Sequence, residues 1–334
     1  MNEYINNLRE EMYKQNCNSQ YIKLVIDYAE NLLKNNVEVI YDLDHISLLT
    51  NKSIGDFLDI NNYYKEIQIS KRNGETRTLA IPDDNLKSVQ KWILKSILEK
   101  MPISNSAKGF KKGLSIVENA KPHTNKDCVL SLDLKDFFPS ITQGSVYFIF
   151  KEIGYTEEVS RLLTRLCTYQ GQLPQGAPTS PYIANLVCRK LDIKLQEFAC
   201  NQNIAYTRYA DDLTFSANKE LSEYIPRIKE IVIIQGFKVN DSKTRCRYRH
   251  QRQLVTGLVV NNEKVSIPRE LKRKLRQEIH YCKKFGVHGH LYWGIKYYSN
   301  YKDYLLGMAL YVKMVDKNLG KKLLEEIKSI NWEY

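Results

Sequence analysis

The chain has 334 residues, of which 43% are hydrophobic, so it can bury sizeable cores and a wholly disordered state is excluded. Its 50 lysines and arginines outnumber 38 acidic residues, and the formal net charge of +12 favours a polyanionic partner, nucleic acid before an anionic membrane. No apolar run reaches the length of a membrane span, and the first residues lack a secretion-signal pattern. We therefore expect a soluble cytoplasmic protein that does not bind membranes.

Cysteine usage fits a reducing compartment. The seven cysteines are odd in number, widely scattered and never spaced as Cys-x-x-Cys. This distribution favours reduced thiols over disulfides or zinc ligands.

The N-terminal region is expected to be helical. Within residues 1–60, Tyr21, Leu24 and Tyr28 belong to an apolar pattern at helical spacing. Further along, Asp84 is placed to cap another helix with an apolar face. The chain therefore begins with a helical extension.

Residues 64–70 and 76–81 alternate as in two strands of a β-hairpin around a turn at Asn73-Gly74. Arg77 lies on the second strand, and Lys71 and Arg72 stand near the turn. A basic hairpin of this kind is suited to contact phosphate, although charges on exposed hairpins are also commonly just solvated.

The centre of the chain mixes strands and helices. Residues 128–134 form an apolar run that predicts a buried strand ending near Asp133, and two further strands, 204–208 and 213–216, bracket an acidic turn. Helices are expected over 143–167, 180–200 and 219–235, and short strands over 237–240, 245–249, 254–260 and 264–267. The result is an α+β fold with helices at both ends.

Asp211 and Asp212 stand side by side in the predicted turn and repel each other unless solvent or a cation separates their charges. If the neighbouring strands share a sheet with the strand that ends at Asp133, the three carboxylates converge. Such an oxygen-rich site suits Mg²⁺, which takes its remaining ligands from water and substrate phosphates. The alternative is an ordinary exposed acidic turn.

An ordered set of segments resembles the reverse transcriptases. The segments are Asp-Leu-Lys-Asp-Phe-Phe at 133–138, Leu-Pro-Gln-Gly-Ala-Pro at 173–178, Tyr-Ala-Asp-Asp at 209–212, and Lys243. The resemblance covers about residues 64–267 and implies a right-hand polymerase fold with fingers, palm and thumb. The implied activity is that of an RNA-directed DNA polymerase, a nucleotidyltransferase acting on dNTP substrates.

The resemblance also implies residue roles. Asp133, Asp211 and Asp212 would be the metal-binding catalytic acids for two Mg²⁺ ions, and Lys243 would protonate the leaving pyrophosphate. Phe138 would act as a steric gate against the ribose 2′-hydroxyl. The remaining dNTP-binding residues implied by the resemblance are Arg77, Asp136, Phe137, Gln175 and Gly176.

Two shorter signatures resemble those of retron reverse transcriptases. These are Asn119, Ala120 and His123 in an Asn-Ala-x-x-His pattern and Val255, Thr256 and Gly257 as Val-Thr-Gly. They imply an enzyme that binds its own structured noncoding RNA, primes from a guanosine 2′-hydroxyl and makes branched RNA–DNA called msDNA. Retrons of this type commonly act in antiphage defence with a separate effector protein.

Other interpretations stay open at this level. In one of them, His123 only forms a hydrogen bond with a neighbouring carbonyl group, and Thr256-Gly257 only shapes a hairpin near the primer. The chain would then be another bacterial reverse transcriptase of group II intron-like, diversity-generating or abortive-infection type. A non-catalytic RNA-binding scaffold with the same fold is the alternative outside the enzymes.

Basic residues near the C-terminus favour RNA binding, and the candidates are Arg245, Arg247, Arg249, Lys272, Arg273 and Arg276. Trp293, Tyr297 and Tyr301, spaced by four, are expected in the core of a helical thumb. The predicted organisation is an N-terminal extension over 1–60, fingers with a retron-specific insertion over 61–127, a palm over 128–250 with finger elements around 140–180, and a primer-grip hairpin with an RNA-binding thumb over 251–334.

Overall fold

The computed structural model describes residues 2–55, 59–70, 74, 76–293 and 300–332. Lys71, Arg72 and Tyr297, which the sequence analysis singles out, lie outside the described residues, as does the side chain of Trp293. Within the described part of the chain, no helix combines the length and apolar character of a membrane span.

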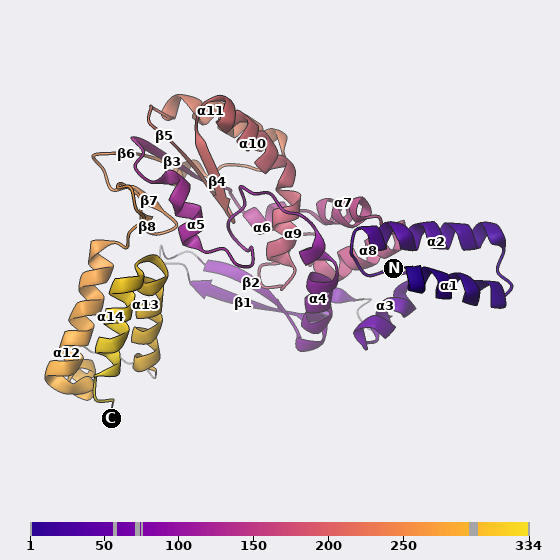
Figure 1. Ribbon diagram of the computed structural model, residues 1–334, viewed down its shortest axis with the longest axis horizontal. Helices are drawn as coiled ribbons and strands as arrows, with labels where there is room; N and C mark the ends of the chain where they lie inside the picture. The colour runs from indigo at the N-terminus through magenta and orange to yellow at the C-terminus, as the bar shows by residue number, and fades with distance from the viewer. Residues whose placement is uncertain (1, 56–58, 71–73, 75, 294–299, 333–334) are drawn as a thin grey trace.

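Three helices open the chain: α1 (Asn2–Lys14), α2 (Ser19–Lys34) and α3 (Leu43–Thr50). The Asn18 side chain accepts a hydrogen bond from the Gln20 amide at 2.7 Å and so starts α2. The buried face of α2 carries Ile22, Ile26 and Ala29, which recur at helical spacing. The predicted helical N-terminus is confirmed, and α1 and α2 protrude together at one end of the molecule (Figure 1).

The predicted hairpin is confirmed as β1 (Tyr64–Ser70) paired antiparallel with β2 (Thr76–Pro82), after the short helix η2 (Ile60–Tyr63). Next come α4 (Asp84–Ser96) and η3 (Leu98–Lys100). The expected cap is one residue off, because the carboxylate of Asp83 accepts the Leu86 amide at 2.8 Å and Asp84 is already helical.

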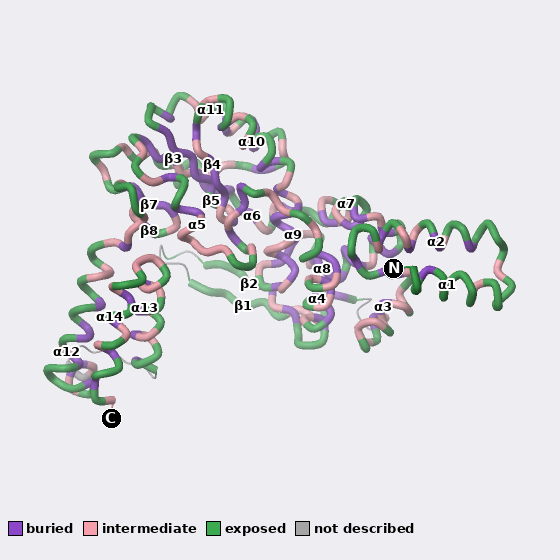
Figure 2. Tube along the Cα trace, in the orientation of Figure 1, coloured by how far each residue is buried: buried purple, intermediate pink, exposed green. Residues whose placement is uncertain are grey.

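A four-stranded antiparallel sheet forms the centre of the molecule. Its order is β4 (Ala205–Tyr209), β5 (Asp212–Ala217), β3 (Cys128–Asp133) and β6 (Arg245–Tyr248). The apolar run of β3 is buried between its neighbours, as Figure 2 shows for the central strands. The strand that ends at Asp133 and the two strands that bracket Asp211 and Asp212 therefore share one sheet, as the sequence analysis considered.

In Figure 1, α10 and α11 cover one side of this sheet, whereas α7 and α8 lie away from it, next to α2. The helices of this part of the chain are α5 (Ile116–Ala120), η4 (Lys121–His123), α6 (Phe137–Ser140), α7 (Gln143–Ile153), α8 (Glu157–Cys167), α9 (Ser180–Val187), α10 (Arg189–Asn201), η5 (Ser222–Tyr224), α11 (Ile225–Ile234) and η6 (Asp241–Lys243). The helices expected over 143–167 are confirmed as α7 and α8, and Gly154 ends α7 in a left-handed conformation with φ of 114°. The single long helix expected over 180–200 is instead divided at Cys188 into α9 and α10.

The C-terminal region packs separately. A tight hairpin of β7 (Leu254–Val255) and β8 (Leu258–Val259) replaces the single strand expected over 254–260, and Thr256 and Gly257 turn the chain with positive φ. Three helices follow, α12 (Arg269–Trp293), kinked at Gly286, α13 (Tyr301–Val315) and α14 (Lys317–Lys328). Tyr301 is fully buried there, as predicted.

Two hydrophobic cores divide the described residues. The larger joins the N-terminal helices to the central sheet and its helices. The smaller joins the β7–β8 hairpin to α12–α14 and includes two residues from the rest of the chain, Ala120 and Val129. The fold is α+β, as expected, with its C-terminal helices at the end opposite α1 and α2 (Figure 1).

Candidate active site

Three aspartates meet where two central strands end. Asp133 closes β3 and is the direct antiparallel partner of Asp212, which opens β5. Asp211 precedes Asp212 in the turn from β4, and its carbonyl accepts the Leu134 amide at 2.9 Å. The ladder therefore brings together carboxylates that lie almost 80 residues apart in the chain.

The turn that carries Asp211 is tight and tolerates little change. Tyr209 pairs with Asp212, so only two residues connect the strands, and Ala210 adopts a left-handed φ of 57°. Gly109 packs against this turn, and a Cβ at Gly109 would lie 2.8 Å from the Ala210 nitrogen. Both sides of the turn are thus fixed by backbone contacts.

A buried polar network supports the same turn from beneath. The guanidinium of Arg208 donates to both Asp192 oxygens at 2.8 and 2.7 Å, to Asn185 Oδ1 at 3.1 Å and to the Ala210 carbonyl at 3.1 Å. Arg208, Asp192 and Asn185 are all fully buried. The network is hydrogen-bonded on every side, so it holds the Ala210 carbonyl in one place.

Sequence reasoning missed this network. The detectable signal was one arginine, Arg208, at the end of an otherwise uncharged predicted strand, directly before the acidic turn. Its partner Asp192 lies 16 residues away in a helix, and nothing in the local pattern pairs the two.

Burial and mutual repulsion set the charge state of the acids. Burial raises the pKa of Asp212 to about 6, with further increases from Asp211 and Asp133, while Lys243 lowers it. Burial and Asp133 also raise the pKa of Asp211, and the Lys243 and Arg77 charges lower it. Full ionisation of the cluster near neutral pH therefore depends on nearby positive charge.

The residues present fit a hard divalent cation. The donors are carboxylate oxygens, the ligand type that Mg²⁺ prefers. The Lys243 ammonium contacts both oxygens of Asp133 at 3.0 and 2.9 Å and so already places a cation on this carboxylate. Among the described residues the three carboxylates do not form a group with all ligand oxygens within 4.8 Å, as expected while like charges repel.

The β1–β2 hairpin and the 173–178 loop lie against each other beside the aspartates. The Ala80 amide donates to the Gln175 carbonyl at 2.9 Å, and a Cβ at Gly176 would lie 2.6 Å from the Ala80 carbonyl oxygen. Glycine is thus required for close packing of this loop on β2. The Gln175 Oε1 atom is buried without a hydrogen-bond partner in the described structure, and the charge of Arg77 acts on Asp211. The loop at Gln175 thus contacts the hairpin that carries Arg77, and Arg77 is near enough to Asp211 to lower its pKa.

The segment after β3 splits into exposed and buried positions. Asp136 is exposed with a left-handed φ of 48°, and it starts α6. The Phe137 ring is buried against Phe237, so only its backbone is available to a ligand. Phe138 is half-buried, and its ring lies 6.2 Å from the Phe110 ring. Phe138 is the ring of this segment that a bound nucleotide would meet.

The two shorter signatures meet each other and the central sheet. The Asn119 amide donates to the Thr256 hydroxyl at 3.5 Å across 137 residues, and Thr256 donates to the Ile116 carbonyl at 3.3 Å. His123 bonds Ser216 Oγ at 2.7 Å and Thr207 Oγ1 at 2.8 Å, on β5 and β4. We call the hydrogen bond between the Asn119 amide and the Thr256 hydroxyl the Asn119–Thr256 contact.

Most residues of the two shorter signatures are buried, which limits their access to RNA. Asn119, Ala120, His123 and Val255 are buried and are not placed to touch RNA directly, while Thr256 is half-buried and Gly257 is exposed. Burial, with a smaller effect from the Lys126 charge, lowers the pKa of His123 to about 3. The imidazole is therefore neutral at physiological pH and serves as a hydrogen-bonding link within the interior.

The basic candidates lie mostly on the surface. Arg245 and Arg247 alternate outward on the edge strand β6, and Arg249 is exposed but paired with Asp127 at 3.2 Å. On α12, Arg273 and Arg276 are exposed and Lys272 is half-buried. These side chains remain available for contact with phosphate.

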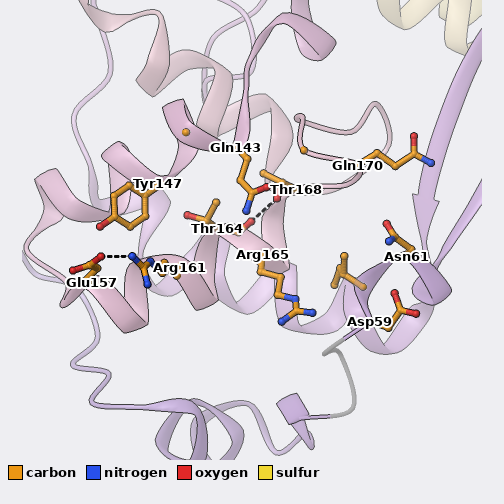
Figure 3. Close-up of a pocket in the computed structure, with 13 residues that line it drawn as sticks. Asp59, Asn61, Gln143, Tyr147, Glu157, Arg161, Thr164, Arg165, Thr168 and Gln170 are labelled. Carbon is orange, nitrogen blue, oxygen red and sulfur yellow. Dashed lines mark hydrogen bonds and ion pairs between the residues drawn. The ribbon is translucent and has the colours of Figure 1, made fainter.

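A separate cavity of about 860 Å³ lies between η2, α7 and α8 (Figure 3), and Asp133, Asp211 and Asp212 are not among its lining residues. Its lining is polar and includes Gln143, Thr164 and Arg165, and Arg161 pairs with Glu157 at its edge. None of the candidate site residues lines it. The cavity is therefore not the catalytic centre.

Comparison with known proteins agrees with this geometry. The model of the family described as "Reverse transcriptase (RNA-dependent DNA polymerase)" matches residues 69–281. The Retron Ec86 reverse transcriptase of Escherichia coli is 36% identical over 275 residues, covering 81% of this chain and 82% of that protein. The Retron Ec73 reverse transcriptase of Escherichia coli is 31% identical over 318 residues, which cover 87% of this chain and 97% of that protein.

A third relative, the Retron Mx162 reverse transcriptase of Myxococcus xanthus, is 36% identical over 308 residues, which cover 82% of this chain and 62% of that protein. The family match spans well over half of the 334 residues. The matched range includes the aspartate-bearing strands and the positions of both shorter signatures. The chain belongs to the retron-type reverse transcriptases, which are RNA-directed DNA polymerases.

Proposed function

We propose that this reverse transcriptase binds its own structured noncoding RNA, starts DNA synthesis from a guanosine 2′-hydroxyl in that RNA and produces branched msDNA. The observation that carries the proposal is the Asn119–Thr256 contact. It joins the two retron signatures to each other and, through His123, to the strands that carry the aspartates. A generic polymerase has no need of such a link, whereas an enzyme dedicated to one RNA must align that RNA with its catalytic centre.

The proposed organisation is that of a right hand. The β1–β2 hairpin and the helices near residues 140–180 act as fingers, the central sheet as palm, and the β7–β8 hairpin with α12–α14 as primer grip and thumb. The two hydrophobic cores support a division between palm and thumb. Ala120, from the first retron signature, packs in the thumb core and so connects the two parts.

Reverse transcriptases use divalent metal ions, and for this chain we assign two Mg²⁺ ions to Asp133 and Asp211, with Asp212 as the third acid. Bound Mg²⁺ would lower the pKa of the attacking hydroxyl and stabilise the leaving pyrophosphate. The residues supply the oxygen donors, and the raised pKa values of Asp211 and Asp212 indicate that nearby positive charge would stabilise their ionised forms.

Around this centre, Arg77 and the Gln175–Gly176 loop would hold the dNTP, together with the backbone at Asp136 and Phe137. Hydrogen bonding to Asp133 raises the pKa of Lys243, so its ammonium group stays protonated near neutral pH. A protonated amine beside the acids is suited to donate its proton to departing pyrophosphate.

Phe138 would exclude ribonucleotides, because a half-buried ring under the sugar leaves no space for a 2′-hydroxyl. The Phe138→Ala variant is expected to incorporate ribonucleotides at least about tenfold more often than the wild type. Competition between a dNTP and the matching rNTP in primer extension measures this. Unchanged discrimination would remove Phe138 from the gate.

RNA binding is assigned to the basic surface. Arg245 and Arg247 on β6 and Arg273 and Arg276 on α12 are exposed, with Arg249 and Lys272 as further candidates. Contacts of this kind release counterions, so RNA affinity should fall steeply with salt. In the cytoplasm, the resulting RNA–DNA complex would work with a separate effector protein in antiphage defence.

The test is to express the chain with its neighbouring noncoding DNA, purify it and digest the bound nucleic acid separately with RNase and DNase. The expected product is a discrete short single-stranded DNA joined to RNA. It should be absent from a variant with Asp211→Asn and Asp212→Asn, while the RNA remains bound. RNA without DNA in the wild type would contradict msDNA synthesis, and extension of an added primer would then identify another kind of reverse transcriptase.

A further inference from the structure

Two thiols and a carboxylate converge at the end of the central sheet that lies opposite the aspartates. Cys128 opens β3 and pairs with Ala217, whereas Asp133 closes the same strand. Ligand atoms of Cys128, Cys246 and Glu220 all lie within 4.8 Å of one another. In the part of the chain that the structure describes, no other three His, Cys, Asp or Glu residues do so.

The two sulfurs belong to neighbouring strands and face each other. Cys128 pairs with Tyr248 and Cys246 pairs with Leu130, so the two cysteines stand diagonally on one face of the β3–β6 ladder. Their Sγ atoms are 2.9 Å apart, and both are free thiols. Burial and the neighbouring sulfur raise the pKa of Cys128 to about 12, so a thiolate pair requires a compensating cation.

Glu220 is held in position as a third ligand. Its Oε1 atom accepts hydrogen bonds from the Leu221 amide at 3.1 Å, the Ser222 amide at 2.9 Å and the Tyr248 hydroxyl at 2.9 Å. Hydrogen bonds from Ser222 and Tyr248 lower the pKa of this carboxylate. An ionised carboxylate oriented by such outer contacts is typical of metal ligands.

We propose that Cys128, Cys246 and Glu220 bind one Zn²⁺ ion, with water as the fourth ligand. Two sulfurs and one oxygen suit tetrahedral zinc, which would separate the sulfurs to about 3.8 Å. Cys246 lies on the edge strand and is only half-buried, so rotation of its side chain provides this movement. The ion ties the start of β3 and the segment after β5 to β6, the strand that carries Arg245 and Arg247.

The experiment uses the full chain, purified under reducing conditions, stripped of metal with a chelator and titrated with Co²⁺ alone. One equivalent is expected to produce thiolate-to-cobalt charge-transfer absorption, and zinc should displace it. Cys246→Ser should lose this absorption, and Glu220→Gln should keep it while binding zinc about 10- to 100-fold more weakly. Cys200→Ser, which removes an exposed thiol outside the cluster, is the matched control and should behave like the wild type.

Circular dichroism verifies that each variant is folded. If Cys246→Ser does not fold, Glu220→Gln provides a second test, because its position is exposed. The proposal is overturned if the wild type produces no thiolate absorption, or if Cys246→Ser retains it. A Cys128–Cys246 disulfide in protein whose thiols are capped at lysis would also overturn it, because oxidised sulfurs cannot ligate the ion.

Discussion

Two ion pairs near the catalytic turn have similar lengths and opposite surroundings. The Arg208–Asp192 pair is 2.7 Å long with both side chains fully buried, whereas the Lys243–Asp133 pair is 2.9 Å long with Lys243 58% exposed. The first is completed by further hydrogen bonds from Arg208 to Asn185 and Ala210. A buried, completed pair has no freedom to rearrange, so it fixes the turn, while the exposed pair is free to exchange partners during a reaction.

The largest expected effect is on the acids themselves. Replacing Asp211 and Asp212 together by Asn should abolish DNA synthesis, because the change removes the charges that hold divalent metal with little change of shape. The free energy of unfolding at pH 7 should stay the same or rise, since two carboxylate charges that repel each other are lost. Primer extension and urea unfolding measure the two quantities, and full-length DNA from this variant would refute the metal assignment.

Lys243→Ala should slow synthesis by about 10²- to 10⁴-fold through loss of the proton donor. Its effect on unfolding should be smaller than that of breaking the Arg208–Asp192 pair, because the Lys243 side chain is 58% exposed and partly screened by solvent, although its Asp133 partner is only 13% exposed. Lys243→Arg is the matched control, since arginine keeps the charge and does not release a proton. A rate restored to the wild-type value in that variant would assign Lys243 an electrostatic role only.

Breaking the buried pair should act on stability. Asp192→Asn leaves the Arg208 charge buried without compensation, and the expected cost is about 3–5 kcal/mol in urea unfolding. Glu152→Gln is the matched control, because it breaks the exposed Arg189–Glu152 pair at the start of the same helix, α10, at a cost below about 1 kcal/mol. If the two variants lost equal amounts of unfolding free energy, buried and exposed ion pairs would not differ in their contribution to stability.

His123 adds an effect that depends on pH. Its folded-state pKa of about 3 lies below the ordinary value of 6.5, so the unfolded chain binds the proton first as the pH falls. This contribution to stability is complete above pH 6.5 and is lost towards pH 3, by about 1.4 kcal/mol per pH unit. The slope of unfolding free energy against pH should be shallower in His123→Gln, and an unchanged slope would contradict this role of His123.

The central strands and their acidic turn were predictable because their signals are local. The apolar run of β3, the alternation in β1, β2 and β6, and the Asp211-Asp212 turn each lie within a few consecutive residues. A primer-grip hairpin was expected in the C-terminal region, with Thr256-Gly257 as possible turn residues, but the local pattern over 254–260 favoured one continuous strand. It did not show two short strands, because Thr256 is β-branched and adopts a left-handed φ of 46° that such residues rarely accept. Only packing on the thumb core reveals that turn.

Long-range partnerships were beyond the sequence as well. The Arg208 network joins a strand to two helices, and the cluster of Cys128, Cys246 and Glu220 joins three segments, two of which are 118 residues apart. The absence of Cys-x-x-Cys spacing therefore argued against zinc ligands, whereas the fold brings Cys128 and Cys246 together from distant segments. The Asn119–Thr256 contact belongs to the same class, since its two signatures are recognisable locally but their meeting is not.

On this proposal, catalysis and choice of RNA reside in separate, linked parts of the molecule. The most direct measurement compares Thr256→Val with the wild type in two assays, synthesis on the cognate RNA and extension of a generic primer. Valine keeps the branched shape and removes the hydroxyl that bonds Asn119 and Ile116. We expect the cognate reaction to fall about tenfold relative to the generic one. Equal losses in both assays, or none in either, would contradict the claim.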